Sequence, residues 1–341
     1  MGLDAALVAA GYDVVWLDLS ETEEWEVRSE HPLPASLLGR RARSSWHESL
    51  ASLLLGFGVE LALPAVHGPI GQDGRLHALC ESLALPYVGC SRSATVDCYD
   101  KLRCKRMLQA AGLPVAHGVS VERAAYERDV PVVVAAVERE LGYPCIVKPA
   151  RGGSSLGLAR VERRDELAAA IAQAFAFDDL VLVEELFPGA DVEIGVLEAD
   201  AMVVGTPVEL DYEGTLYDFE IKCAGDRDVR YLPARLSADL LDRATAAAGE
   251  AFTATGCSGL ARVDLLVDPA SDRFVVNEIN TIPHMPASST FASSLCHRTG
   301  ETYGNLLTWI VQAALAQPRG ERAVAAATRS QPARIAASQA S

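Results

Sequence analysis

Residues 262–286 read RVDLLVDPASDRFVVNEINTIPHMP and contain the feature that decides the fold. Two runs rich in Val and Leu, which are typical of strands, flank the turn-like DPASD, yet each carries acids where a core strand should be apolar. Alternate side chains of a strand share one face, so Arg262 projects with Asp264, and Glu278 projects with Asn280. If the two runs pair as a hairpin, one face gathers two carboxylates, an amide oxygen and a guanidinium.

The composition indicates a soluble protein of more than one domain. Its 341 residues suffice for two or three domains, and the formal charge of −16 argues against a general nucleic-acid-binding surface. The eight cysteines are scattered singly, and no basic, apolar signal segment opens the sequence. No apolar run approaches the roughly 20 residues that span a bilayer. We therefore expect a cytoplasmic protein with no membrane or nucleic-acid partner.

The order of helix-like and strand-like segments indicates an α/β fold. Helix and strand patterns alternate at the start of the chain, which predicts a domain with a parallel sheet. The chain opens on a helix, however, as though a first strand and the loop after it were missing. Later sections contain paired strand-like segments and further helices. Residues 317–341 have little bulky apolar material to bury, so we expect a disordered tail.

A glycine-rich loop between two strand-like segments is a candidate phosphate site. The stretch RGGSSLG, residues 151–157, allows tight turning and presents backbone N–H groups to an anion, although an ordinary hairpin turn is the alternative. It lacks the GKS ending of a P-loop. Lys148 in the apolar segment CIVKP favours the phosphate interpretation, because a lysine is costly to bury without an anionic partner.

Two other segments fit a nucleotide, and each has a structural alternative. Lys101, in DKLRCK, is either a second cation for the phosphates or a solvated lysine in the first turn of a helix. Glu184 and Glu185 end the run LVLVEE, and Asp191 follows a Pro-Gly turn. Such a strand end presents backbone groups to an adenine edge and carboxylates to ribose hydroxyls, or it forms a surface acidic turn.

The hairpin acids have a specific chemical interpretation. Magnesium favours oxygen ligands, takes only a few carboxylates from the protein, and completes its shell with water and substrate phosphate. Asp264, Glu278 and Asn280 meet that requirement. Salt bridging with Arg262 and neighbouring lysines is the competing account.

Together these segments resemble the ATP-grasp ligases, and within them the D-alanine–D-alanine ligases. The resemblance runs from about residue 11 to residue 315 and rests on AVHGPIGQDGRLHALCESLALPYVGC, DKLRCKRMLQAAGLP, CIVKPARGGSSLG, LYDFEIK, ARVDLLVD and NEINT. HGPIGQDG and LYDFEIK are specific to that subgroup. The resemblance implies a three-domain ATP-grasp architecture, α+β in its ATP-binding part, which we place at residues 1–93, 94–180 and 181–316.

Carried over by motif, the resemblance gives each candidate residue a role. The residues expected at ATP are Lys101, Lys148, Ser154, Ser155, Glu184, Glu185, Leu186, Asp191 and Lys222. Those expected to hold two Mg²⁺ ions, with Mn²⁺ as an alternative, are Asp264, Glu278 and Asn280. Arg262, Ser154 and Lys222 would act in the reaction, and His67 and Ser289 would bind amino-acid substrates.

The implied activity is an ATP-dependent carboxylate–amine ligase that makes a D-alanyl-D-alanine-type dipeptide for the cell wall. One amino-acid carboxylate would attack the γ-phosphate of ATP, giving an acyl phosphate and ADP. The amine of a second amino acid would then displace phosphate. Both steps concentrate negative charge, which magnesium, lysines and Arg262 would disperse. Family members are commonly homodimers, so the resemblance implies that assembly.

The departures from the family pattern lie in the amino-acid pocket. Gln72 stands where Glu is usual, Cys223 where Tyr is common, and His284 where a glycine is normal. Ser289 is the positional match for a carboxylate-binding Ser, with Ser288 as a close competitor. Three explanations remain: a protein start upstream of residue 1, a related ligase of a specialised peptide pathway with other substrates, or a non-catalytic nucleotide-binding descendant.

Overall fold

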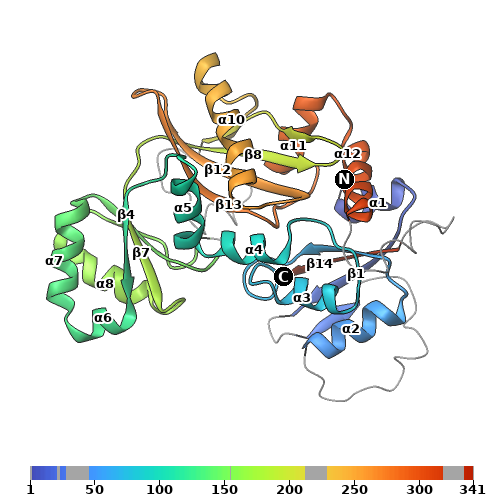
Figure 1. Ribbon diagram of the computed structural model, residues 1–341, viewed down its shortest axis with the longest axis horizontal. Helices are drawn as coiled ribbons and strands as arrows, with labels where there is room; N and C mark the ends of the chain where they lie inside the picture. The colour runs from blue at the N-terminus through green and yellow to red at the C-terminus, as the bar shows by residue number, and fades with distance from the viewer. Residues whose placement is uncertain are drawn as a thin grey trace.

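The chain folds around three separate β-sheets with helices packed against them (Figure 1). This computed structural model describes residues 2–20, 24–27, 46–153, 155–211, 229–317 and 334–340. In Figure 1 the N-terminal sheet lies at the lower right, the central sheet forms a lobe at the left, and the third sheet lies above them. The mixture of helices and sheets confirms the expected fold class.

The N-terminal sheet has the strand order β2-β1-β14-β3. Its parallel strands are β1 (Asp13–Leu19), β14 (Arg334–Ala340) and β3 (Leu61–Ala65), and β2 (Trp25–Val27) runs antiparallel to β1. All five residues of β3 are buried, as expected for a parallel strand covered on both faces. The helices of this part of the chain are α1 (Leu3–Ala9), α2 (Trp46–Gly56) and α3 (Arg75–Ser82).

Strand β14 corrects the prediction that residues 317–341 form a disordered tail. Residues 334–340 lie between β1 and β3 and pair with both of them. Composition suggested disorder because small residues bury little apolar area. The backbone of a central strand, however, is held by ladder hydrogen bonds on both sides, whatever its side chains are. The other residues of the predicted tail lie outside the described part, except Gln317.

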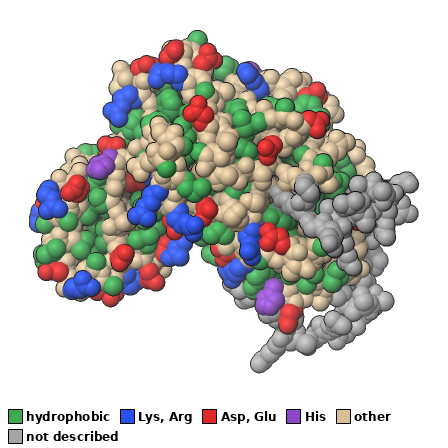
Figure 2. All heavy atoms as spheres, in the orientation of Figure 1, with side chains coloured by type: hydrophobic (Ala, Val, Ile, Leu, Met, Phe, Trp, Pro, Cys, Tyr) green, Lys and Arg blue, Asp and Glu red, His purple; other side chains and the backbone are tan. Residues whose placement is uncertain are grey.

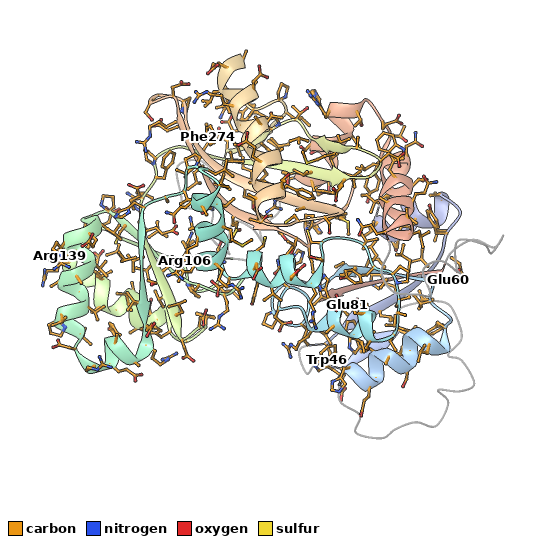
Figure 3. The ribbon with its side chains drawn as sticks, in the orientation of Figure 1. Trp46, Glu60, Glu81, Arg106, Arg139 and Phe274 are labelled. Atoms are coloured by element: carbon orange, nitrogen blue, oxygen red, sulfur yellow. The ribbon has the colours of Figure 1, made fainter. Side chains whose placement is uncertain are left out.

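The central sheet has the order β4-β7-β5-β6, and all of its pairs are antiparallel. Its strands are β4 (Gly118–Glu122), β5 (Cys145–Pro149), β6 (Ala159–Val161) and β7 (Leu180–Glu185). A cluster of buried Val, Leu, Ile and Ala side chains joins this sheet to its helices. These helices are α6 (Arg123–Arg128), α7 (Val130–Leu141) and α8 (Arg164–Ala174). Arg139 of α7 lies on the outer side of the lobe, away from the third sheet (Figure 3).

The third sheet contains the hairpin predicted from residues 262–286. Its order is β11-β10-β8-β12-β13, with β9 paired to β8. All of its strand pairs are antiparallel. Its strands are β8 (Ala190–Glu198), β9 (Met202–Val204), β10 (Val208–Asp211), β11 (Val229–Tyr231), β12 (Leu260–Asp268) and β13 (Arg273–Asn280). Arg262 faces Asn280 and Asp264 faces Glu278 across the hairpin, which confirms the predicted pairing.

The remaining helices connect the sheets. The alanine-rich α10 (Ala238–Ala254) packs on β8, β12 and β13 in one apolar core, which also includes residues of α4 (Arg92–Tyr99) and α5 (Lys101–Ala110). A second core joins α1 to α11 (Thr290–Thr299) and α12 (Tyr303–Ala316). None of the helices in the described ranges is long and apolar enough to cross a membrane.

Removal of residues 334–341 should destabilise the N-terminal sheet. β14 is in register with seven residues of β1 and five of β3, so its loss leaves the facing edges of both strands without partners. Each buried backbone hydrogen bond contributes roughly 1 kcal/mol, so we expect the free energy of unfolding to fall by at least about 3 kcal/mol. Calorimetric unfolding of the truncated chain measures this.

A point substitution serves as a control that keeps the chain length. Ala337→Pro removes a backbone donor at the middle of β14 and should lower the unfolding midpoint in the same direction. An unchanged midpoint in both the truncated chain and this variant would contradict the strand's structural role.

Candidate active site

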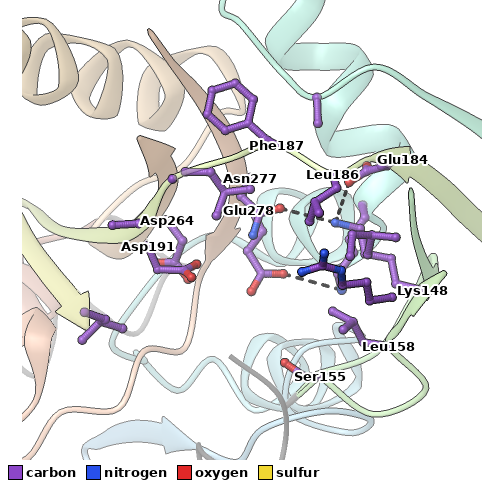
Figure 4. A pocket seen from close by; sticks show the side chains of 18 of the residues that line it. Lys148, Ser155, Leu158, Glu184, Leu186, Phe187, Asp191, Asp264, Asn277 and Glu278 are labelled. Atoms are coloured by element: carbon purple, nitrogen blue, oxygen red, sulfur yellow. Dashed lines mark hydrogen bonds and ion pairs between the residues drawn. The ribbon is translucent and has the colours of Figure 1, made fainter. Parts of the chain in front are cut away.

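A cavity of about 560 Å³ lies between the central sheet and the third sheet, lined by residues from both. The central sheet contributes Lys148 and Glu184, whereas the third sheet contributes Asp191, Asp264 and Glu278. Figure 4 shows Asp191 and Asp264 on one side of the cavity and Lys148 and Glu184 on the other, with Glu278 between them. A notch also separates the central lobe from the N-terminal part of the surface (Figure 2).

A β-bulge turns two consecutive residues of β13 toward this cavity. Asp264 pairs with Glu278, but the next residue, Leu265, pairs with Val276, so Asn277 has no direct partner on β12. Consecutive residues of a regular strand face opposite sides, and a bulge re-aims one of them. Both Asn277 and Glu278 consequently line the cavity.

The start of α5 brings Lys101 to the cavity, beside the glycine-rich loop. Asp100 caps this helix by accepting a hydrogen bond from the backbone N–H of Arg103, which places Lys101 in the first turn. The backbone N–H of Lys101 donates to the carbonyl of Ala150, just after β5. The Nζ atom of Lys101 lies 2.8 Å from the carbonyl oxygen of Gly152 and 3.6 Å from Glu278 Oε2.

Glu184 is buried between two lysines. Its oxygens lie 3.0 Å from Lys105 Nζ and 2.8 Å from Lys148 Nζ, and its side chain is only 4% exposed. Burial favours a raised pKa for Glu184, but Lys148 and Lys105 outweigh burial and hold the pKa below its usual value. Lys148 Nζ also donates to Asn277 Oδ1 at 3.3 Å, which links the central sheet to the bulge.

Three carboxylates form one row across the third sheet. Glu193 of β8 and Glu278 of β13 both face Asp264 of β12. Arg262 makes a bidentate ion pair with Asp264, at 2.6 and 2.7 Å, and its Nη2 lies 3.1 Å from Glu193 Oε1. Burial raises the pKa of Asp264 above its usual value, and the neighbouring carboxylates act in the same direction against Arg262.

The carboxylate oxygens of Asp264 and Glu278 fit a magnesium ion. Within the described ranges, no three or more His, Cys, Asp and Glu residues form a ready-made metal cluster. Magnesium needs fewer, since one or two carboxylates with water and substrate phosphates complete its octahedral shell. Asp264 and Glu278 supply two carboxylates at the cavity, and their crowding makes an added cation favourable.

The residues predicted to bind the amino-acid substrates, His67 and Ser289, lie beside the cavity and do not line it. His67 is exposed, although desolvation of its ring, with the nearby His284 and Arg262, lowers its pKa to about 4. Desolvation, Arg262 and Arg230 also lower the pKa of His284. The lowered pKa values favour the neutral form of both imidazoles, and Arg262 and Arg230 supply positive charge nearby.

The structure brings most of the predicted nucleotide residues to the cavity, but not every predicted site residue. The predicted residues that line it are Lys101, Lys148, Ser155, Glu184, Glu185, Leu186, Asp191, Asp264 and Glu278. The predicted residues that do not line it are His67, Arg262, Asn280 and Ser289. Ser154, Lys222 and Cys223 lie outside the described residues.

The side chains of Asn280 and Ser289 both accept backbone hydrogen bonds outside the cavity lining. The Oδ1 atom of Asn280 accepts hydrogen bonds from the backbone N–H of Ile282 at 3.1 Å and from Gln72 Nε2 at 3.3 Å. Ser289 caps α11 by accepting from the backbone N–H of Ala292. Ser288 contacts Arg230, whose Nη1 donates to the Ser288 carbonyl.

Sequence reasoning missed several polar residues that the structure brings to the site, among them Lys105, Glu193 and Asn277. Lys105 lies four residues after Lys101, a spacing that places both on one helix face. Glu193 lies two residues after Asp191 on a strand, which places both on one sheet face. These two spacings were visible in the sequence. The exposure of Asn277 to the cavity depends on the bulge, for which the sequence carries no clear signal.

Two antiparallel sheets that close on a cavity lined by lysines, carboxylates and a glycine-rich loop define an ATP-grasp fold. Residues 107–312 match the family described as D-ala D-ala ligase C-terminus. The chain belongs to the D-alanine–D-alanine ligase family, whose members are ATP-dependent ligases that form a peptide bond.

Several similar proteins carry the corresponding name. A D-alanine–D-alanine ligase of Kineococcus radiotolerans is 41% identical over 77% of this chain and 72% of its own length. One of Deinococcus radiodurans is 32% identical over 91% of each chain. Among solved structures, the VanG D-Ala:D-Ser ligase of Enterococcus faecalis superposes with a TM-score of 0.72 at 26% identity, covering 91% of this chain and 93% of that one.

Replacement of Glu184 should destabilise the protein strongly. In Glu184→Gln the two lysines face a neutral amide, and breaking such a buried pairing costs about 3–5 kcal/mol of unfolding free energy. Adding Lys105→Met to this variant removes one surplus cation and should restore part of the loss. Denaturant unfolding at pH 7 measures both variants.

The difference in unfolding free energy between wild type and Glu184→Gln should depend on pH. Because the pKa of Glu184 lies below its usual value of 4.5, its contribution is fully present above pH 4.5 and is lost as the pH falls through the lower, folded-state pKa. The stability difference between wild type and Glu184→Gln should therefore shrink below pH 4.5. A difference that grows on acidification would contradict this assignment.

Proposed function

We propose that this protein joins two amino acids at the expense of ATP, releasing ADP and phosphate, with two D-alanines as the reference substrates. One observation supports this most directly: lysines of the central lobe and carboxylates of the third sheet face one cavity, in a chain of this family. Lysines on one wall suit the phosphates of a nucleotide, and carboxylates on the other suit the cation that accompanies them.

The first step is a phosphoryl transfer. A carboxylate oxygen of the first amino acid forms a bond to the γ-phosphorus of ATP, and the bond from that phosphorus to the bridging oxygen of ADP breaks. Lys101 and Lys148 would bind the phosphates, and Glu184 keeps Lys148 in place. Mg²⁺ held by Asp264 and Glu278 would neutralise phosphate charge during this step.

The second step is attack on the resulting acyl phosphate. The neutral amine of the second amino acid bonds to the acyl carbon and a tetrahedral oxyanion forms. The bond from the acyl carbon to the phosphate oxygen then breaks as the carbonyl reforms, and the proton lost from the attacking nitrogen leaves with the phosphate as hydrogen phosphate. Arg262 is the proposed hydrogen-bond donor to that oxyanion, and its bidentate pairing with Asp264 orients the guanidinium. His67 and Ser289 are the proposed contacts for the amino acids.

The remaining assignments are proposals that rest on the family. Ser154 and Lys222 would act with Arg262, and the active form would be a homodimer. The seven cysteines in the described part of the chain are free thiols, which supports a reducing compartment such as the cytoplasm.

Product analysis tests the reaction directly. The purified protein incubated with ATP, Mg²⁺ and D-alanine should release ADP and phosphate in equal amounts and form the dipeptide. Parallel incubations with D-serine and with L-amino acids identify the preferred pair. Formation of AMP and pyrophosphate would identify a different chemistry, and absence of nucleotide turnover with every amino acid would refute the proposal.

Replacement of Arg262 should separate binding from chemistry. Arg262→Ala should retain Mg²⁺-dependent ATP binding but lose ligation by about a hundredfold, because loss of one oxyanion donor costs about 3 kcal/mol. Arg262→Lys keeps the charge but not the planar fork and should recover only part of the rate. Calorimetry measures ATP affinity, and wild-type turnover in the Ala variant would refute the role of Arg262.

A further inference from the structure

Glu193 is a buried carboxylate that the proposed mechanism does not use. It lies on β8 opposite Asp264, and its side chain is only 7% exposed. Its Oε1 lies 3.1 Å from Arg262 Nη2, and its Oε2 accepts a hydrogen bond from the hydroxyl of Thr290. A buried carboxylate is costly unless its oxygens have partners, and here each oxygen has a different one.

The two partners of Glu193 belong to different elements of the proposed site. Arg262 is the residue assigned to the oxyanion. Thr290 is the first residue of α11 and follows Ser289, the residue assigned to the carboxylate of the second amino acid. One side chain therefore connects the two groups that would act on the same acceptor substrate.

The packing of α11 on β8 makes this connection rigid. At Gly195 an added Cβ would lie only 2.8 Å from the carbonyl oxygen of Phe291, so the helix approaches the strand closely. The hydroxyl of Ser294 accepts from the backbone N–H of Gly195 at 3.1 Å and donates to the carbonyl of Thr206 at 2.7 Å. These contacts hold α11 against β8 at Phe291 and Ser294, and the contact between Glu193 and Thr290 adds a polar link at the first residue of the helix.

We propose that Glu193 is a positioning residue that sets the distance between the Arg262 guanidinium and the first turn of α11, where Ser289 would hold the acceptor amino acid. The inference rests on the proposed ligase function and deepens it. Attack on an acyl phosphate requires the amine and the oxyanion donor to be placed together, and a misplacement of about 1 Å can cost about a hundredfold in rate. Neither Arg262 nor Ser289 alone fixes that separation.

Hydrogen exchange tests the positioning without any reaction. The informative amides are those of Ala292 and Ser293, which donate to the Ser289 hydroxyl and carbonyl respectively. In Glu193→Gln and in Thr290→Val, exchange at these amides should accelerate about tenfold, the effect of losing one hydrogen bond to a charged group. The matched controls are Glu198→Gln, at the end of the same strand, and Thr299→Val, at the end of the same helix, and both should leave this exchange unchanged.

Kinetics with ATP and D-alanine test the consequence. Glu193→Gln should lower kcat at least about tenfold, with the KM for ATP within about threefold of wild type. Thr290→Val should mainly raise the KM of the second amino acid. Because Glu193→Gln removes the charge from the acceptor of this hydrogen bond and Thr290→Val removes its donor, the double variant should be less impaired than the product of the two single effects.

Several outcomes would overturn the inference. Unchanged exchange at Ala292 and Ser293 in both variants would show that Glu193 does not hold α11. Fully additive kinetic effects would show that the two residues act separately, and a selective loss of Mg²⁺-dependent ATP affinity in Glu193→Gln would make Glu193 a cation ligand instead. If wild type shows no turnover, the proposed function fails, and the exchange measurement still decides whether Glu193 positions α11.

Discussion

The site depends on one constraint, namely that each charge buried between the two sheets must face a charge of opposite sign. Glu184 lies between Lys105 and Lys148, and Arg262 lies between Glu193 and Asp264. The first group has one surplus positive charge and lies on the central-sheet side of the cavity. The second has one surplus negative charge, which Glu278 increases. The two walls are therefore complementary to an anion with its cation, and this complementarity is built by pairing within each sheet.

The β-bulge in β13 connects these two charge groups. It turns Asn277 toward Lys148 on the central sheet while leaving Glu278 opposite Asp264 on its own sheet. A regular strand could present only one of these two side chains to the cavity. The hydrogen bond from Lys148 to Asn277 links the two sheets, and Lys101 at the start of α5 adds an ion pair with Glu278. A small apolar cluster also joins Ala116 and Phe187 to Val275 of β13.

Much of this arrangement could be predicted from the sequence, because the spacing of residues in a strand or helix determines which side chains lie on the same face. The alternation of Arg262 with Asp264 and of Glu278 with Asn280 predicted the hairpin and its polar face, and the glycine-rich loop predicted the second wall. Lys105 and Glu193 had the right spacing but resembled ordinary charged residues, because only tertiary packing shows that they are buried. Strand β14 was not predicted, since its placement depends on vacant edges of β1 and β3 rather than on its own composition.

The amino-acid end of the site shows why a departure from the family pattern can be compatible with the fold. Gln72 occupies a position where the resemblance leads one to expect Glu. Its Oε1 accepts from the backbone N–H of Gly68 at 2.7 Å, and its Nε2 donates to Asn280 Oδ1 at 3.3 Å. An ionised glutamate could accept from Gly68 but would face the Asn280 oxygen with a second acceptor. The neutral amide satisfies both contacts and ties the loop that contains His67 to the end of β13. Gln72 thus carries no charge beside His67, the proposed amino-acid contact, and it joins the loop of His67 to the strand that bears the metal candidates.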